Sequence, residues 1–185
     1  STYPGTVTFS LPHNQGKGAA LKLGFEKAKG DFILFMDADL STPLDNFEEF
    51  IRNLPDEKTI LIGNRKIKED LIKIRQNLIR RKLGKIFTVL CNLILNLHIT
   101  DYTCGFKLFP REAGKRIFSR TTVNLWGFDA EILYLAHLFR YDLKEIPVTW
   151  YNDANTRVNL ITDAINSLAD IIQIKINSYR KKYAD

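Results

Sequence analysis

The chain has 185 residues, of which 45% are hydrophobic and 26% charged, and its formal net charge is +6. These values are typical of a single globular domain, over residues 1–185, with a substantial core, and they exclude a low-complexity chain. No run reaches roughly 18 uninterrupted apolar residues, so no membrane-spanning segment is expected. Two cysteines are too few for a metal cluster or a disulfide framework, which favours a reducing, cytoplasmic environment.

Strand-like and helix-like segments alternate along the chain. Apolar or alternating runs predict strands over residues 6–10, 32–36, 59–63 and 143–150, with a strand-like run near 105–109. Helical spacing predicts helices over residues 19–29, 44–54, 66–97, 111–118, 126–140 and 158–179. Pro147 cannot donate a backbone hydrogen bond, so the last strand should lie at a sheet edge or contain a bulge. The order of elements predicts an α/β layered domain.

Two carboxylates follow the most apolar strand. The run at residues 32–36 suits a strand buried on both faces, and it ends at Asp37 and Asp39, which a strand would point to one side. Open α/β sheets bind ligands at the carboxyl ends of their strands, so this pair is a candidate cation site. The alternative is that both acids simply begin a loop, where such residues are common.

A glycine-rich turn precedes the first predicted helix. Asn14, Gly16, Lys17 and Gly18 lie where backbone N–H groups and a helix dipole could bind a phosphate, with Lys17 adding a positive charge. The turn lacks the spacing of a Walker motif. A tight strand-to-helix turn with a solvated lysine explains the residues equally well.

Basic residues gather in the first half of residues 66–97, and the second half is almost wholly apolar. This pattern suits a helix at a membrane interface that holds an anionic headgroup, or a core helix with a solvated basic end. Nucleic acid is not expected as a partner, because no aromatic residues are interleaved with the charges. Further on, Asp129 and Glu131 fall in the first turn of a predicted helix, where acids also serve as ordinary caps.

Six motifs occur in one order along the chain. They are Asn14-Gln-Gly-Lys-Gly18, Asp37-Ala-Asp39, Gly63-Asn-Arg65, Asp101-x-x-Cys-Gly-Phe-Lys107, Trp126-x-Phe-Asp-x-Glu131 and Glu145-Ile-Pro-Val-x-Trp150. Together they resemble the family 2 glycosyltransferases, and within them the polyprenyl-phosphate sugar transferases that transfer glucose or mannose to dolichyl phosphate. The resemblance covers nearly the whole chain. It implies a GT-A (Rossmann-like) fold with a mixed, mostly parallel sheet flanked by helices.

The resemblance implies a donor site for a nucleotide sugar, UDP-glucose being the expected donor. Asp37 and Asp39 would hold Mg²⁺ or Mn²⁺ against the diphosphate, with Asp39 the main ligand and catalytic residue. The turn from Asn14 to Gly18 would lie on the nucleotide side. Asp101 matches a carboxylate near the sugar and would position the donor.

The resemblance also implies a polyprenyl-phosphate acceptor at the cytoplasmic face of a membrane, and transfer with inversion. A lipid phosphate is already ionised near neutral pH, so positioning by arginine matters more than a general base. Arg65 matches a phosphate-binding arginine, and the resemblance implies that Arg65 and Asp101 are catalytic residues together with Asp39. The other acceptor-side residues would be Arg80, Arg81, Thr156 and Arg157 for the phosphate, and the acids Asp129 and Glu131.

The chain departs from the family pattern at a few points. Ser41 stands where some relatives have Gln or His, and Thr156-Arg157 stands where relatives usually have Ser-Lys. The family's first strand and helix would precede Ser1, so we expect an N-terminally truncated domain. Two other functions stay open: a non-catalytic module that binds a membrane or a partner through its basic helix, and a family 2 transferase acting on a polysaccharide. Homo-oligomer formation is also left open.

Overall fold

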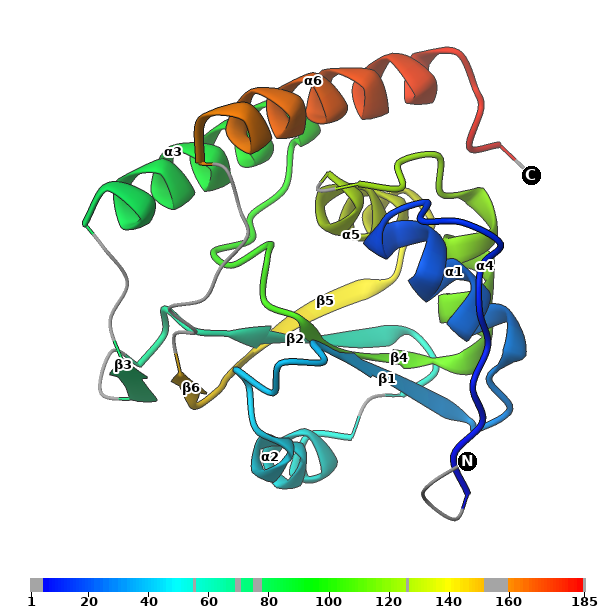
Figure 1. Ribbon diagram of the computed structural model, residues 1–185. Helices are drawn as coiled ribbons and strands as arrows, with labels where there is room; N and C mark the ends of the chain where they lie inside the picture. Colours follow the sequence, from blue (N-terminus) through cyan, green and yellow to red (C-terminus); the bar gives the residue numbers. More distant parts are fainter. Residues whose placement is uncertain are drawn as a thin grey trace.

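The computed structural model describes residues 5–54, 56–68, 71–74, 78–125, 127–151 and 160–184, without the side chains of residues 73, 74, 78–80 and 160–165. Four strands form the main sheet in the order β1-β4-β2-β5 (Figure 1). Strand β4 runs antiparallel to both β1 and β2, whereas β2 and β5 are parallel. Three strands therefore run in one direction and β4 runs against them, which confirms the predicted mixed sheet. The strands are β1 (Phe32–Met36), β2 (Thr59–Asn64), β4 (Phe106–Pro110) and β5 (Asp142–Pro147).

Helices cover both faces of this sheet (Figure 1). One face carries α1, α4 and α5, and the short helix α2, preceded by a 3₁₀ turn at Leu44–Asn46, covers the other. Helices α3 and α6 pack side by side and form an outer layer beyond α5. The helices are α1 (Lys17–Lys27), α2 (Phe47–Arg52), α3 (Leu78–Leu95), α4 (Arg111–Arg120), α5 (Phe128–Leu138) and α6 (Leu160–Tyr179).

Alternation along the strands builds two cores. Phe35 of β1 and Ile62 of β2 point into the larger core, under α1, α4 and α5, while Leu61 of β2 points into the smaller core beside Phe50 of α2. Successive side chains of a strand face opposite sides, so apolar runs without a polar break are needed when both faces are covered. The continuous apolar run of β1 is explained by this double burial.

Two predicted elements, over residues 6–10 and 66–97, differ from the structure. Residues 6–10 form no strand; Val7 and Phe9 are 73% and 52% exposed, because the segment pairs with no strand among the described residues. The helix predicted over residues 66–97 is wrong in its first part, since β3 (Ile72–Ile74) pairs in parallel with β6 (Trp150–Tyr151) and α3 starts only at Leu78. Pairing with a distant strand outweighs local helical spacing here.

The strand predicted over residues 143–150 is two strands. Strand β5 ends at Pro147 and β6 belongs to the second, two-stranded sheet. The edge position inferred from Pro147 is confirmed, because β5 is the last strand of the main sheet. None of the helices in the described ranges combines the length and apolar character needed to cross a membrane.

Candidate active site at the carboxyl ends of the strands

Four strand ends meet at one edge of the main sheet. The register pairs Met36 with Phe106 and Asn64 with Pro147, so the carboxyl ends of β1, β2 and β5 lie beside the amino end of β4. Ligands bind at such edges in open α/β sheets. The polar residues at this edge are Asp37 and Asp39 after β1, Arg65 after β2 and Asp101 in the loop before β4.

Asp37 is fixed against the loop that enters β4. Its backbone N–H donates to the carbonyl of Gly105 at 2.9 Å, and a Cβ built on Gly105 would lie only 2.0 Å from the Asp37 carboxylate. Only glycine leaves room for this approach. The same carboxylate accepts a hydrogen bond from Nζ of Lys17, at the start of α1. The chain thus places a lysine and an aspartate from two distant motifs in contact.

Lys17 lies in a strongly negative environment. Burial alone would lower the pKa of Lys17, but the charges of Asp129, Asp37 and Asp39 outweigh it and raise that pKa above its ordinary value. Its ammonium group also lies 5.5 Å from the centre of the Phe128 ring at the start of α5. Lys17 is therefore held as a cation at neutral pH, beside both aspartates.

Asp39 follows in a tight turn. Its carboxylate accepts the N–H of Ser41 at 2.9 Å, and Leu40 between them takes a left-handed φ of 55°. Two carboxylates of this kind fit Mg²⁺ or Mn²⁺, which use one or two protein carboxylates and complete their shell with water and substrate phosphate. Among the described residues, no group of three or more His, Cys, Asp or Glu side chains could hold a metal ion.

The glycine-rich turn at Asn14–Gly18, which the sequence predicts to bind a phosphate, packs against the backbone of another loop of the protein. Gly16 N–H donates to Oδ1 of Asn14 at 3.0 Å, and Gly18 N–H donates to the carbonyl of Asn124 at 2.9 Å. A Cβ on Gly16 or Gly18 would lie 2.3 or 2.8 Å from a backbone carbonyl oxygen, of Asn124 or Val123 respectively. These glycines allow the turn to pack against the loop 121–127. Nucleotide binding by Asn14, Gly16 and Gly18 stays a prediction, and Lys17 carries the positive charge of this turn.

Arg65 and Asp101 form a two-pronged ion pair. Nε and Nη2 of Arg65 donate to the two carboxylate oxygens of Asp101 at 2.8 and 2.7 Å, and the backbone N–H of Arg65 adds a third bond at 3.0 Å. Burial alone would raise the pKa of Asp101, but the guanidinium charge lowers it to about 2. Burial alone would lower the pKa of Arg65, and Asp101 raises it instead.

Arg65 and Asp101 differ in their exposure to solvent, which suits them to different roles. The Asp101 side chain is fully buried, whereas Arg65 keeps 18% of its side chain exposed and lies 5.3 Å from the Trp150 ring. Such a planar guanidinium can bind a phosphate while Asp101 holds it in place. Direct contact between Asp101 and a sugar stays a prediction.

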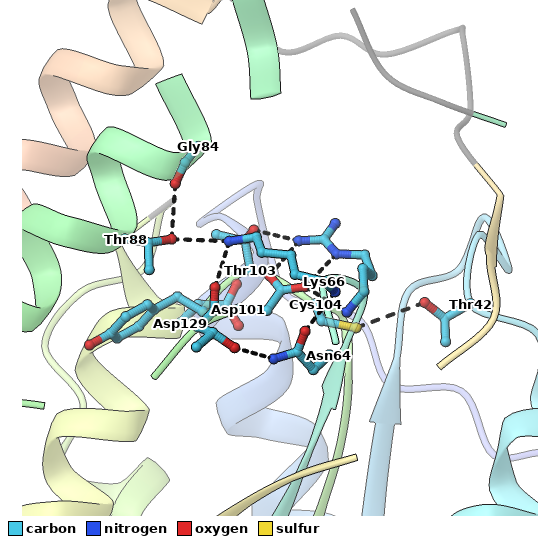
Figure 2. A network of polar contacts seen from close by, with 12 residues as sticks. Thr42, Asn64, Lys66, Gly84, Thr88, Asp101, Thr103, Cys104 and Asp129 are labelled. Atoms are coloured by element: carbon cyan, nitrogen blue, oxygen red, sulfur yellow. Dashed lines mark hydrogen bonds and ion pairs between the residues drawn. The ribbon is translucent and has the colours of Figure 1, made fainter. Parts of the chain in front are cut away.

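A network behind Arg65 was not anticipated from the sequence. Glu145 of β5 accepts hydrogen bonds from Nδ2 of Asn64 at 2.6 Å and from the backbone N–H groups of Thr100 and Asp101. Lys66 donates to the Thr100 carbonyl at 2.6 Å and to Thr88 of α3 at 3.1 Å, as Figure 2 shows for Thr88. The network joins the ends of β2 and β5 to α3 and so fixes the loop that carries Asp101.

A buried ion pair lies beneath the site. Lys107 of β4 is fully buried and donates to Asp129 of α5 at 2.5 Å and to the carbonyls of Tyr102 and Cys104 at 2.9 and 2.7 Å. A lysine between Phe106 and Leu108 in a buried strand is a signal that the sequence offered, because lysine is almost never buried unless paired. Asp129 is thus committed to Lys107 while its charge still reaches Lys17.

Glu131 is fully buried and surrounded by donors. Its oxygens accept the N–H groups of Thr122 and Val123 at 2.8 to 2.9 Å, the Thr122 hydroxyl at 2.6 Å and the Tyr183 hydroxyl at 2.7 Å. Contact between Glu131 and an acceptor stays a prediction, and the side chain would have to leave these partners to make it.

The remaining predicted residues are placed only in part. Arg81 is half-buried near the start of α3, and Arg80 precedes it on the same helix, with its side chain outside the described ones. Thr156 and Arg157 lie outside the described residues. The structure brings Lys17, Asp37 and Asp39 together, and it brings Arg65 to Asp101.

The chain resembles known glycosyltransferases in sequence and in fold. The family model described as glycosyl transferase family 2 matches residues 2–118. A dolichyl-phosphate beta-glucosyltransferase of Trichomonas vaginalis is 33% identical over 179 residues, which cover 94% of this chain and 53% of that protein. The human enzyme of the same name is 35% identical over 147 residues, covering 76% of this chain and 45% of its own length. The chain spans about half the length of the curated relatives it matches.

One solved structure shows the same fold. Glucosyl-3-phosphoglycerate synthase from Mycobacterium tuberculosis, solved in complex with UDP, superposes with a TM-score of 0.62 at 14% identity, covering 89% of this chain and 57% of that one. The predicted GT-A architecture is thereby confirmed. The family match covers more than half of the chain and the sequence relatives agree with it, so this chain belongs to glycosyl transferase family 2.

Proposed function

We propose that the protein carrying this chain transfers glucose from UDP-glucose to dolichyl phosphate, or a similar polyprenyl phosphate, with inversion at the sugar carbon. The observation that carries the proposal is the pairing of Lys17 with the Asp37 and Asp39 loop at the same sheet edge as Arg65. The names of the sequence relatives support the acceptor and the sugar, and the UDP named for the solved neighbour supports the nucleotide.

The donor side needs to stabilise a departing nucleoside diphosphate. Asp37 and Asp39 would hold a divalent ion, Mg²⁺ or Mn²⁺, which supplies charge neutralisation to the diphosphate when bound. Lys17, kept protonated by the surrounding aspartates, binds an oxygen of the same diphosphate and orients it. The Phe128 ring, whose centre lies 5.5 Å from the ammonium group, adds a cation–π contact that helps to hold Lys17 in place.

The acceptor side needs to orient an oxygen that is already negative. A phosphomonoester attacks without a strong general base, so a fixed cation contributes more than a proton acceptor. Arg65 is such a cation: Asp101 holds two of its nitrogens and Thr103 accepts from Nη2 at 2.8 Å. The guanidinium plane is thereby fixed before substrate binds, which reduces the entropy lost on binding.

The outer helices support a membrane-surface location. Ile86, Val89 and Leu93 form an exposed stripe on α3, and Ile172, Ile176 and Tyr179 form another on α6. We call these the α3 stripe and the α6 stripe. Leu93 is 75% and Tyr179 is 79% exposed. Lysines such as Lys82, Lys85 and Lys175 lie on the same two helices, as expected of a surface that rests on anionic lipid.

The proposal is tested by transfer of radiolabelled glucose from UDP-glucose, using the full-length protein with Mg²⁺ or Mn²⁺. Dolichyl phosphate should be glucosylated, whereas dolichol, which lacks the phosphate, should not. Asp39→Asn should lower the rate at least about a hundredfold, as loss of a group stabilising the transition state does. Equal transfer to dolichol, or undiminished transfer by Asp39→Asn, would refute the proposal. Membrane binding without any transfer would favour a non-catalytic module.

A further inference from the structure

The described residues of the loop 121–127, which are 121–125 and Gly127, lie between α4 and α5 and contact both the donor-side turn and the C-terminal helix. On one side, the carbonyl of Asn124 accepts the Gly18 N–H at 2.9 Å, and Gly16 packs so closely that a Cβ would lie 2.3 Å from the same oxygen. Lys22 of α1 also donates to the carbonyl of Thr121 at 3.2 Å. The position of the Gly16–Gly18 turn is therefore set by the backbone of this loop.

On the other side, Glu131 and the C-terminal segment hold the loop. The buried Glu131 carboxylate binds the N–H groups of Thr122 and Val123, and Tyr183, just beyond α6, donates its hydroxyl to that carboxylate at 2.7 Å. Asn177 of α6 donates to the Thr122 hydroxyl at 3.1 Å.

Asp170 of α6 makes a further connection with the loop. Its Oδ2 accepts the N–H of Gly127 at 3.1 Å, and a Cβ on Gly127 would lie 2.3 Å from the Cβ of Asp170. Asn177 and Asp170 therefore bond directly to the loop, and Tyr183 reaches it through Glu131. Such a connected and buried polar network is rigid when all its members are satisfied.

We propose that Glu131 and Tyr183 are positioning residues for Lys17, acting through the loop 121–127. Tyr183 donates to Glu131, and Glu131 accepts the N–H groups of Thr122 and Val123. The carbonyls of Val123 and Asn124 then pack against Gly16 and Gly18 of the turn. Lys17 lies between the two glycines of that turn and donates to Asp37. The donor role of Lys17 rests on the proposed function, whereas the mechanical link rests on the contacts alone.

The link connects the α6 region to the donor side of the site. Because the α6 stripe lies on the outer layer, anything that shifts α6 shifts the partners of the loop. In the described part of the chain, no Lys, Arg or His side chain is among the hydrogen-bond partners of the buried Glu131, so neutral donors stabilise its carboxylate. Removing one donor weakens the hold on the loop without leaving the carboxylate unpaired.

Tyr183→Phe in the full-length protein tests the link. The substitution removes one hydroxyl and keeps the ring that packs 6.5 Å from Tyr134. Tyr134→Phe is the matched control, since it removes a hydroxyl that joins α5 to α6 at 2.7 Å, through Ser178, without touching the loop. Tyr183→Phe loses the bond to Glu131 and a longer contact of 3.5 Å with the Thr122 hydroxyl, and Tyr134→Phe loses its bond to Ser178, so both variants weaken the contacts of α5 and the adjoining loop with the C-terminal region. Urea unfolding of both variants measures any difference in global stability, and exchange rates are compared after correction for it.

Hydrogen exchange and UDP binding give two independent results. We expect Tyr183→Phe, and not Tyr134→Phe, to speed amide exchange at Thr122, Val123 and Gly18. We also expect the Kd for UDP with Mn²⁺ to rise about fivefold, while the KM for dolichyl phosphate stays unchanged. A merely structural role would change exchange equally in both variants.

The outcomes separate this inference from the proposed function. Unchanged exchange at Gly18 in Tyr183→Phe overturns the link, even if the unmodified protein binds UDP. Faster exchange at Gly18 with an unchanged Kd for UDP overturns the positioning of Lys17. If the unmodified protein does not bind UDP, the donor role of Lys17 and the proposed function both fail, and the exchange result alone decides the link.

Discussion

At the scale of single residues, the site depends on side chains that pack closely against neighbouring backbone and against one another. Gly105 admits the Asp37 carboxylate, and Asp101 holds Arg65 through three hydrogen bonds. Each of these residues is buried or partly buried, where a lost partner costs more than the bond itself contributes. Changes at these positions should therefore alter both stability and ligand binding.

Replacing Asp101 by asparagine should change how stability depends on pH. The pKa of Asp101 is lowered from 3.8 to about 2, so its charge stabilises the fold fully above pH 4 and this contribution is lost as the pH falls toward 2. Between pH 4 and pH 2 the free energy of unfolding of the unmodified protein should fall by about 2 kcal/mol more than that of Asp101→Asn. Urea unfolding at several pH values measures this difference. Parallel pH curves for the two proteins would contradict the assignment.

Replacing Gly105 by alanine should disturb Asp37 directly. The new Cβ would lie 2.0 Å from the carboxylate, so the side chain or the strand must shift, and we expect a loss of about 1–3 kcal/mol in stability together with weaker UDP binding in Mn²⁺. Gly84→Ala is the control: nothing lies within 4 Å of its Cβ, and it should raise stability by up to about 1 kcal/mol through helix propensity. Thermal unfolding and titration calorimetry distinguish the two. Equal effects of both substitutions would refute the account of Gly105.

The sequence identified most of the site residues, but not all of their partners. Asp37, Asp39 and Lys17 follow from local signals: a buried strand that ends in acids and a glycine turn before a helix. Lys107 pairs with Asp129, which lies 22 positions further along the chain. Glu131 is enclosed partly by Tyr183, which lies 52 positions away. Local spacing carries no information about such distant partners, so both acids were predicted only as caps or acceptor contacts.

At the scale of whole elements, apolar periodicity predicted the buried helices and strands well. Strand β1 has the bounds predicted for it, and β2 extends only one residue further, because each strand is covered on both faces. The errors fall where a short segment pairs with a distant one. Strands β3 and β6 have three and two residues, too short to leave a period in the sequence, and they exist through their pairing with each other.

The α3 stripe should contribute to membrane binding. Leu93 is 75% exposed, so Leu93→Gln should leave the free energy of unfolding within about 0.5 kcal/mol. On phosphatidylcholine vesicles containing phosphatidylserine, the same change should weaken binding about tenfold, since one leucine no longer enters the lipid. Vesicle co-sedimentation measures the effect.

Leu54→Gln is the matched control for this measurement. Leu54 is 51% exposed and follows α2, which covers the other face of the sheet. Its replacement should leave vesicle binding unchanged. If Leu54→Gln weakens binding as much as Leu93→Gln, the outer layer of α3 and α6 is not the membrane surface.

At the scale of the whole molecule, the charged site and the exposed apolar surface belong to different parts of the fold. The edge of the sheet at the carboxyl ends of β1, β2 and β5 carries the charged groups of the site. Helices α3 and α6 lie in the outer layer (Figure 1), and the exposed apolar stripes belong to them. Lys66 connects these parts by donating to Thr88 of α3 (Figure 2), and the loop 121–127 connects α6 to the Lys17 turn. A lipid phosphate presented at the outer helices would therefore meet a site whose framework those helices help to hold.

The central claim is that Asp37 and Asp39, with Lys17, bind a metal and a nucleoside diphosphate together. Titration calorimetry of UDP into the full-length protein, with and without Mn²⁺, tests it most directly. UDP should bind much more tightly when Mn²⁺ is present, and Asp39→Asn should abolish this metal dependence. UDP binding of the same strength with and without Mn²⁺, or the same metal dependence in Asp39→Asn, would contradict it.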